Sequence, residues 1–229
     1  MTDPIGGIRA CVFDAYGTLL DVTAAARHCR ADLGDAADAL AAVWRAKQLE
    51  YTWVRTLMGA YADFWQVTGE ALDYALDLHG RTDPALRAKL MELYFRLDAF
   101  PDAGPALAAL RGRGMRTAIL SNGSPPMLAG AVDSAKLRPL LDHVLSVDPL
   151  RLYKPHPSVY QLACDRLDLT PAEILFVSSN GWDAAGAAAF GFKVAWLNRA
   201  GNPPDRLPAK PTVTIAGLAE LPALVGAGA

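Results

Sequence analysis

Short apolar runs alternate with helix-like stretches over the first and last parts of the chain. Apolar runs bounded by Gly, Pro or polar turn residues are typical of buried strands. We predict strands at residues 10–13, 117–120, 143–147, 174–178, 194–197 and 212–215. Helical segments separate most of them, and this order favours a parallel sheet. The pattern predicts an α/β protein whose core is a Rossmann-like, doubly wound parallel sheet.

The segment from about residue 22 to residue 97 has no predicted strand, and its apolar positions recur at helical spacing. One such series follows Asp83 and Pro84, a typical N-cap and first-turn pair; it consists of Leu86, Leu90, Leu93 and Leu97. A second apolar face consists of Leu57, Tyr61, Phe64 and Trp65. We predict an all-helical cap domain, residues 21–97, inserted after the first strand of a core domain made of residues 1–20 and 98–229.

Composition excludes several classes of protein. Of the 229 residues, 52% are hydrophobic and 20% charged, so the chain can bury a core and is not disordered. The net charge is −2 and no dense Lys/Arg tract occurs, so we predict no nucleic-acid partner. Without a signal-like segment or an apolar run of membrane-spanning length, we predict no membrane partner and a cytoplasmic location. The scattered Cys11, Cys29 and Cys164 indicate reduced thiols that pack in the core.

The first predicted strand ends at Asp14, just before a turn that contains Gly17. Open α/β folds place their chemistry at the carboxyl ends of the strands. An ionised carboxylate held there can act as a nucleophile and form a covalent intermediate. The alternative is that Asp14 only caps the turn that follows it. The residue alone does not separate these two interpretations.

Three more predicted strands are followed by polar residues. Because parallel strands share one carboxyl edge, these residues are expected to face one cleft together with Asp14. They lie in the segments Ser121-Asn122-Gly123, Lys154-Pro155 and Ser178-Ser179-Asn180-Gly181-Trp182-Asp183. Each segment alone also fits a turn, a surface lysine or a helix start. Their repeated placement at strand ends favours a site.

Four segments resemble the signature motifs of the haloacid dehalogenase superfamily: FDAYGTL at 13–19, LSNG at 120–123, YKP at 153–155 and VSSNGWD at 177–183. Within that superfamily, which also contains many phosphatases, the chain is most similar to the L-2-haloacid dehalogenases. The segment WRAKQLEYTW at 44–53 is close to the cap helix of those enzymes. The resemblance covers essentially the whole chain and implies no metal and no cofactor.

Two departures from the phosphatase pattern agree with dehalogenation. The superfamily's phosphatases carry a second Asp two residues after the nucleophile, where this chain has Tyr16, and extra acidic residues that hold Mg²⁺, where it has Ser178, Ser179 and Asn180. A halide is a weak base that leaves without a proton, so the missing acid does not prevent its departure.

The resemblance implies that Asp14 displaces the halogen at C2 and that water then hydrolyses the resulting ester, which gives a D-2-hydroxyacid. The residues it assigns to catalysis are Asp14, Thr18, Arg45, Ser121, Lys154, Tyr160, Ser178, Asn180 and Asp183. Those it assigns to substrate or halide binding are Tyr16, Arg45, Leu49, Phe64, Ser121, Asn122 and Trp182.

Individual roles follow from the resemblance and from chemistry. Asp183, arranged by Ser178 and Asn180, or else Lys154, would activate the water. Tyr160 would support Lys154 or the pocket. Arg45 would stabilise the halide, although a cation on a mainly apolar helix face can also extend to solvent.

The expected partner is a small 2-haloalkanoic acid, and the resemblance favours a homodimer. A magnesium-dependent phosphatase on the same fold is the main alternative. A catalytically silent protein-binding fold is a more distant one, and the presence of both Asp14 and Lys154 argues against it.

Overall fold

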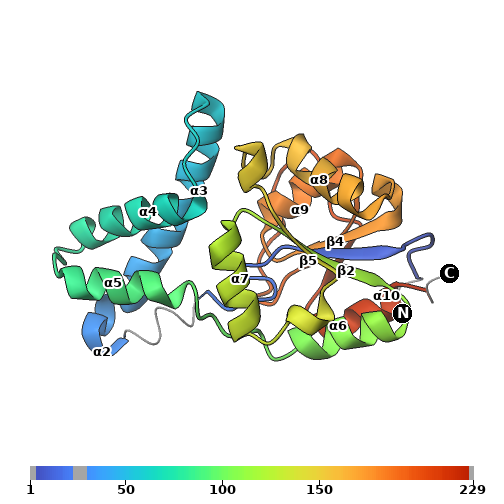
Figure 1. The fold of residues 1–229 in the computed structure, drawn as a ribbon, viewed down its shortest axis with the longest axis horizontal. Helices are drawn as coiled ribbons and strands as arrows, with labels where there is room; N and C mark the ends of the chain where they lie inside the picture. Colours follow the sequence, from blue (N-terminus) through green and yellow to red (C-terminus); the bar gives the residue numbers. More distant parts are fainter. Residues whose placement is uncertain (1–3, 23–29, 227–229) are drawn as a thin grey trace.

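The computed structural model describes residues 4–22 and 30–226, and Cys29 therefore lies outside the described residues. Its centre is a six-stranded sheet in the order β3-β2-β1-β4-β5-β6, with every neighbouring pair parallel (Figure 1). The strands are β1 (Ala10–Phe13), β2 (Arg116–Ser121), β3 (His143–Ser146), β4 (Ile174–Ser178), β5 (Lys193–Leu197) and β6 (Val213–Ile215). Each predicted strand is present and its bounds agree within one residue, which confirms the predicted α/β core.

The strands β1, β2 and β4 lie in the middle of the sheet, and almost all their residues are buried. This explains their continuous apolar runs, because a parallel strand is covered on both faces. The chain adds β2 and β3 on one side of β1 and then β4, β5 and β6 on the other. The direction of winding therefore changes between β1 and β4, which is where such sheets bind ligands.

Helices lie on both faces of the sheet, as a doubly wound core requires. In Figure 1, α8 (Pro157–Leu167) and α9 (Gly181–Phe190) lie above the strands, and α6 (Ala103–Gly112) and α10 (Leu221–Leu224) lie below. The helix α7 (Pro125–Ser134) follows β2. Short 3-10 segments complete the structure at Gly34–Ala36, Arg138–Leu140, Asp148–Leu150, Pro171–Glu173 and Leu218–Glu220. Cys11 and Cys164 are free and buried, as predicted, and burial raises the pKa of Cys11 to about 12.

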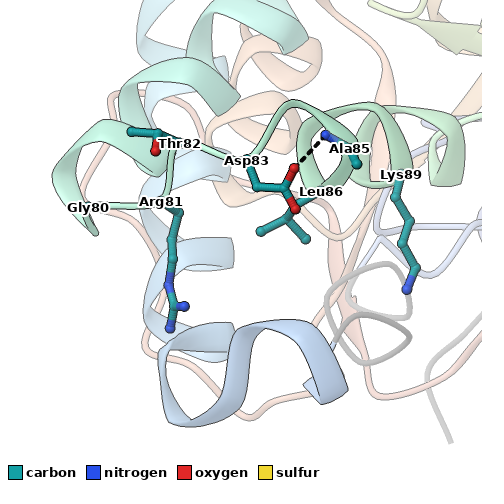
Figure 2. Close-up of a pocket in the computed structure, with 7 residues that line it drawn as sticks. All are labelled: Gly80, Arg81, Thr82, Asp83, Ala85, Leu86 and Lys89. Atoms are coloured by element: carbon teal, nitrogen blue, oxygen red, sulfur yellow. Dashed lines mark hydrogen bonds between the residues drawn. The ribbon is translucent and has the colours of Figure 1, made fainter.

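The chain between β1 and α6 forms a separate group of helices on one side of the sheet (Figure 1). They are α2 (Arg30–Leu33), α3 (Ala37–Met58), α4 (Phe64–Leu78) and α5 (Pro84–Leu93). In the described part of this segment no strand occurs. The predicted start of α5 is confirmed, because Asp83 accepts a 2.8 Å hydrogen bond from the N–H of Ala85 (Figure 2). The apolar series continues past the helix end, since Leu97 is buried but lies beyond Leu93.

The second predicted apolar face was wrong, because one helix ends and the next begins between its members Leu57 and Phe64. Gly59, with a φ of +65°, ends α3, and Asp63 starts α4 by accepting a hydrogen bond from the N–H of Gln66. Leu57 therefore falls on the end of α3, where it is 88% exposed, whereas Phe64 on α4 is buried. Glycine tolerates the left-handed conformation that a helix end of this kind needs.

The chain leaves the core and returns to it at one place. Leu20 and Ala99 form an antiparallel bridge, Asp21 N–H donates to the carbonyl of Asp98, and Phe100 N–H donates to that of Leu19. Both hydrogen bonds measure 2.9 Å. The two connecting segments are therefore tied together at the base of the helical group. Among the described residues, no helix has both the length and the apolar character needed to cross a membrane.

Candidate active site

Asp14 directly follows β1, and its N–H continues the strand ladder by donating to the carbonyl of Val177 at 2.9 Å. Its side chain is 9% exposed. Oδ1 accepts a hydrogen bond from Lys154 Nζ at 3.0 Å, and Oδ2 accepts from Thr18 Oγ1 at 3.1 Å and from Asn180 Nδ2 at 3.0 Å. A buried carboxylate with three donors is satisfied and fixed in orientation.

Lys154 joins two buried carboxylates. Its Nζ lies 3.0 Å from Asp14 Oδ1 and 2.9 Å from Asp183 Oδ2, and its side chain is 1% exposed. Burial by itself would lower the pKa of Lys154, but the charges of Asp14 and Asp183 outweigh it and raise that pKa. Lys154 is therefore positively charged at neutral pH and offsets both carboxylates.

Asp183 lies in the first turn of α9 and is fully buried. Burial raises its pKa and the charge of Asp14 adds to the rise, whereas Lys154 and Tyr160 oppose it. Tyr160 on α8 donates from its hydroxyl to Asp183 Oδ1 at 2.8 Å, so each oxygen of Asp183 has a donor. A carboxylate with a raised pKa is a better base than an exposed one, and this suits it to accept a proton from water.

Gly186 lets the two helices approach closely at this point. A Cβ atom there would lie 2.6 Å from Tyr160 Oη and 2.6 Å from Pro155 Cβ. Real Cβ atoms do not make such contacts, so the hydrogen bond between Tyr160 and Asp183 depends on the absence of a side chain at position 186.

Thr18 connects Asp14 to the loop after β4. Its Oγ1 donates to Asp14 Oδ2 and accepts from the N–H of Ser179 at 2.9 Å. Trp196 on β5 donates from Nε1 to the carbonyl of Ser179 at 3.2 Å and so holds this loop in place. The turn itself needs Gly17, whose φ is +89°.

Three further polar side chains secure the loops after β2 and β4. Asn122 Oδ1 accepts from the N–H of Lys154 at 3.0 Å, which ties the loop after β2 to the lysine. Ser121 Oγ accepts from the N–H of Gly123 at 3.1 Å, and Ser178 Oγ accepts from the N–H of Asn180 at 3.2 Å. With its carbonyl oxygen used in this way, Asn122 presents an amide NH₂ that can donate to an anion.

Tyr16 lies where the helical group meets the core. Its ring centroid is 6.0 Å from that of Phe64 and 5.9 Å from that of Tyr94. The hydroxyl is buried and has no hydrogen-bond partner among the described residues. Burial raises the pKa of Tyr16, the charge of Asp14 raises it further and that of Arg45 opposes it. The phenol is therefore protonated, and it lies within electrostatic reach of both Asp14 and Arg45.

The remaining predicted pocket residues belong to different surroundings. Phe64 is fully buried, and Leu49 is half-buried on α3. Trp182 is half-buried, and its ring centroid lies 5.3 Å from that of Trp53 on α3. Together with Lys154, these two tryptophans line a mainly apolar cavity of about 420 Å³ between the core and the helical group. In the ranges that the structure describes, no three His, Cys, Asp or Glu side chains gather as a metal site requires.

The arrangement of strand ends and charges is matched by a known family. The model of the haloacid dehalogenase-like hydrolases matches residues 8–191, which include every strand end described above except those of β5 and β6. This chain belongs to the haloacid dehalogenase-like hydrolase family.

Relatives within this family share most of the chain. It is 52% identical to (S)-2-haloacid dehalogenase 1 of Pseudomonas sp. (strain CBS-3), covering 95% of this chain and 96% of that protein. It is 51% identical to (S)-2-haloacid dehalogenase 4A of Burkholderia cepacia, and the match covers 88% of this chain and 87% of that protein. The structure of the L-2-haloacid dehalogenase of Xanthobacter autotrophicus with chloropropionic acid covalently bound has 41% identity and a TM-score of 0.89, and the match covers 95% of this chain and 98% of that one.

In this haloacid dehalogenase-like hydrolase, the structure brings together most of the residues predicted to be catalytic. One cluster of direct side-chain contacts holds Asp14, Thr18, Lys154, Tyr160, Asn180 and Asp183. One contact differs from the predicted arrangement: the Asn180 side chain contacts Asp14, and only its backbone carbonyl accepts from the N–H of Asp183. Tyr160 contacts Asp183 and, through it, Lys154.

Sequence reasoning missed two residues. Ser179 holds Thr18 through its backbone, although its position in the VSSNGWD motif was the only signal for it. Gln48 lies on a fully buried stripe of α3, with Leu40, Trp44 and Thr52 at four-residue spacing. Its four-residue spacing from Trp44 and Thr52, three residues after the predicted halide-binding Arg45, was the sequence signal that could have singled it out.

Proposed function

We propose that this protein hydrolyses short-chain L-2-haloacids to D-2-hydroxyacids and halide, through an ester on Asp14 and with inversion at C2. The observation that carries the proposal is the contact of the buried Asp14 with the cationic Lys154, where no acidic residue stands two positions after Asp14. The two relatives of highest identity reported above carry the name (S)-2-haloacid dehalogenase, which supports this substrate class and not a phosphate ester.

In the first step, a carboxylate oxygen of Asp14 attacks C2 from the side opposite the halogen. The new bond joins that oxygen to C2, and the carbon–halogen bond breaks with its electron pair on the halide. The hydrogen bonds from Thr18 and Asn180 fix the carboxylate before attack, so little further orientational freedom is lost on reaching the transition state. Arg45 and the amide of Asn122 stabilise the halide, and Ser121 donates to the substrate carboxylate.

In the second step, water attacks the carbonyl carbon of the Asp14 ester while Asp183 accepts its proton. The bond from that carbon to the C2-bound oxygen then breaks with its electron pair on that oxygen, which takes the second proton of the attacking water. The 2-hydroxyacid leaves with an oxygen that came from Asp14, Asp14 is a carboxylate again, and Asp183 returns its proton to solvent. Lys154 stays charged through both steps and balances the negative charge that forms at the ester.

We also propose that residues 1–20 and 98–229 act as the core domain and residues 21–97 as the cap. The tied segments at Leu20 and Ala99 support these bounds, because they lie where the helical group begins and ends. The protein is proposed to act in the cytoplasm as a homodimer, and analytical ultracentrifugation at micromolar concentration tests the second part.

Oxygen labelling tests the mechanism. In a single turnover of L-2-chloropropionate in heavy-oxygen water, mass spectrometry should find the label in the Asp14 peptide and not in the product. Label only in the product would remove the ester intermediate. Chloride release from L- and D-2-chloropropionate, with and without a chelator, tests the substrate and metal independence. Release only from the D form, or loss of activity with chelator, would contradict the proposal.

A further inference from the structure

Arg45 is held by a buried side chain that has no part in the mechanism described above. Its Nη1 donates to Gln48 Oε1 at 2.6 Å, one turn along α3. Gln48 Nε2 in turn donates to Thr68 Oγ1 on α4 at 2.7 Å. The Thr68 hydroxyl donates to the carbonyl of Phe64 at 2.5 Å. Gln48 and Thr68 are both fully buried.

These contacts run in one direction, from the guanidinium through an amide and a hydroxyl to a backbone carbonyl. Gln48 uses its carbonyl oxygen toward Arg45 and its NH₂ toward Thr68. A half-turn of the amide would point its NH₂ at the guanidinium and would draw the Thr68 hydroxyl proton away from Phe64, so this orientation is favoured. A second bond, from Trp44 Nε1 to the carbonyl of Thr68 at 2.8 Å, fixes α3 against α4 at the same level. A buried polar network in which each member has a partner specifies one geometry.

An apolar pair at positions 48 and 68 would hold the two helices together without the free-energy cost of burying polar groups, which is high unless every hydrogen bond is made. The polar pair is therefore informative because of what it touches. An arginine side chain has large rotamer freedom, and its guanidinium has five N–H donors. The bond to Gln48 fixes one edge of the group and leaves the other donors for a ligand.

The hydrogen-bond partner of Arg45, the amide of Gln48, carries no charge. Two other cap arginines pair with carboxylates, Arg55 with Glu70 and Arg87 with Asp73. In the described ranges no carboxylate lies within ion-pair distance of Arg45. Its charge is therefore oriented by an amide but not neutralised. The same charge opposes the rise in the pKa of Tyr16, to which the charge of Asp14 contributes. This is the environment expected of a cation that meets an anion only during turnover.

We infer that Gln48, backed by Thr68, is a positioning residue that holds Arg45 in place and leaves it charged for the departing halide. The inference rests on the proposed dehalogenation. It also implies that a carboxylate at position 48 would act as an internal competitor of the halide, although Glu and Gln have nearly the same shape.

The test compares Gln48→Glu with wild type in single turnovers of L-2-chloropropionate and L-2-bromopropionate. Halide release should slow by about 10–100-fold, since a displaced catalytic group costs rates of this order. The deficit should be larger for chloride, because the poorer leaving group relies more on Arg45. Hydrolysis of the ester, which follows halide departure, should stay within about twofold of wild type. Gln66→Glu on α4 is the matched control: it places a carboxylate at an exposed site, where it loses a hydrogen bond to Glu70, and it should keep the wild-type rate of halide release.

Thr68→Val and Thr68→Ser decide the question even if Gln48→Glu does not fold. Valine keeps the shape but removes the hydroxyl, so halide release should slow, whereas serine keeps the hydroxyl and should restore it. Equal slowing of halide release and ester hydrolysis, or an unchanged ratio of chloride to bromide rates, would overturn the inference. If wild type releases halide and Gln48→Glu matches it, only the inference fails. If wild type releases none, the proposed function fails and the inference falls with it.

Discussion

The hydroxyl of Tyr160 donates to Asp183 Oδ1 at 2.8 Å, while Lys154 donates to the other oxygen of the same carboxylate at 2.9 Å. Both bonds favour the ionised form of Asp183 and oppose the effect of its burial. The two donors therefore extend to lower pH the range over which Asp183 is ionised and can accept a proton.

Tyr160→Phe should move the acid limb of the kcat profile to higher pH. Loss of the donor raises the pKa of Asp183 further, so more of it is protonated at any given acidic pH, and the protonated form cannot act as a base. The profile is measured with L-2-chloropropionate, and Tyr74→Phe on the exposed face of α4 is the control. An unmoved acid limb would assign the proton transfer to another group.

Arg45→Ala should slow halide release by about 10²–10³-fold, the usual cost of removing a donor to developing charge. Arg55→Ala on the same helix is the control, because Arg55 pairs with Glu70 and should leave the rate near that of wild type. The rates come from rapid-quench measurement of free halide. Equal effects of the two changes would indicate general damage to α3.

Lys154→Met should reduce the free energy of unfolding by about 3–5 kcal/mol at pH 7, because it leaves two buried carboxylates without their cation. The loss should be smaller at pH 5. In the variant the folded-state pKa of Asp183, already raised by burial, rises further above its unfolded value, so stability is present at low pH and is lost as the pH rises. Urea unfolding at both pH values measures this difference, and a pH-independent loss would show that the carboxylates do not depend on Lys154.

Gly186→Ala should destabilise the protein by about 1–3 kcal/mol through overpacking, and it should also impair turnover. The new methyl group meets Tyr160 Oη and Pro155 Cβ at 2.6 Å. Gly104→Ala in α6 has nothing within 4 Å of the added Cβ and is expected to be neutral or slightly stabilising. Comparable effects at the two glycines in urea unfolding would count against the close contact of α8 and α9.

The sheet and the strand-end residues were predictable because both depend on local pattern. Buried parallel strands are continuous apolar runs, and parallel strands share one carboxyl edge, so Asp14, Lys154 and Asp183 were expected to meet. The contact between Tyr160 and Asp183 was not expected, because it depends on how closely α8 and α9 pack. Gly186 sets that distance, and no periodicity in the sequence reveals it.

The helices between β1 and α6 were predicted less well, because spacing alone does not show where a helix ends. Leu57, Tyr61 and Phe64 are spaced as on one helix, but Gly59 and Asp63 end one helix and start the next. Gln48 escaped notice for a related reason. A polar residue one position from Leu49 fits an exposed face until the packing of α3 on α4 places it inside.

The bridge between Leu20 and Ala99 makes the helical segment a cassette. Because the chain leaves and re-enters the core through two adjacent, hydrogen-bonded segments, a different set of helices can be grafted there without changing the strand order of the sheet. Such a chimera would keep the cluster of Asp14, Lys154 and Asp183, and only the helices beside it would be exchanged.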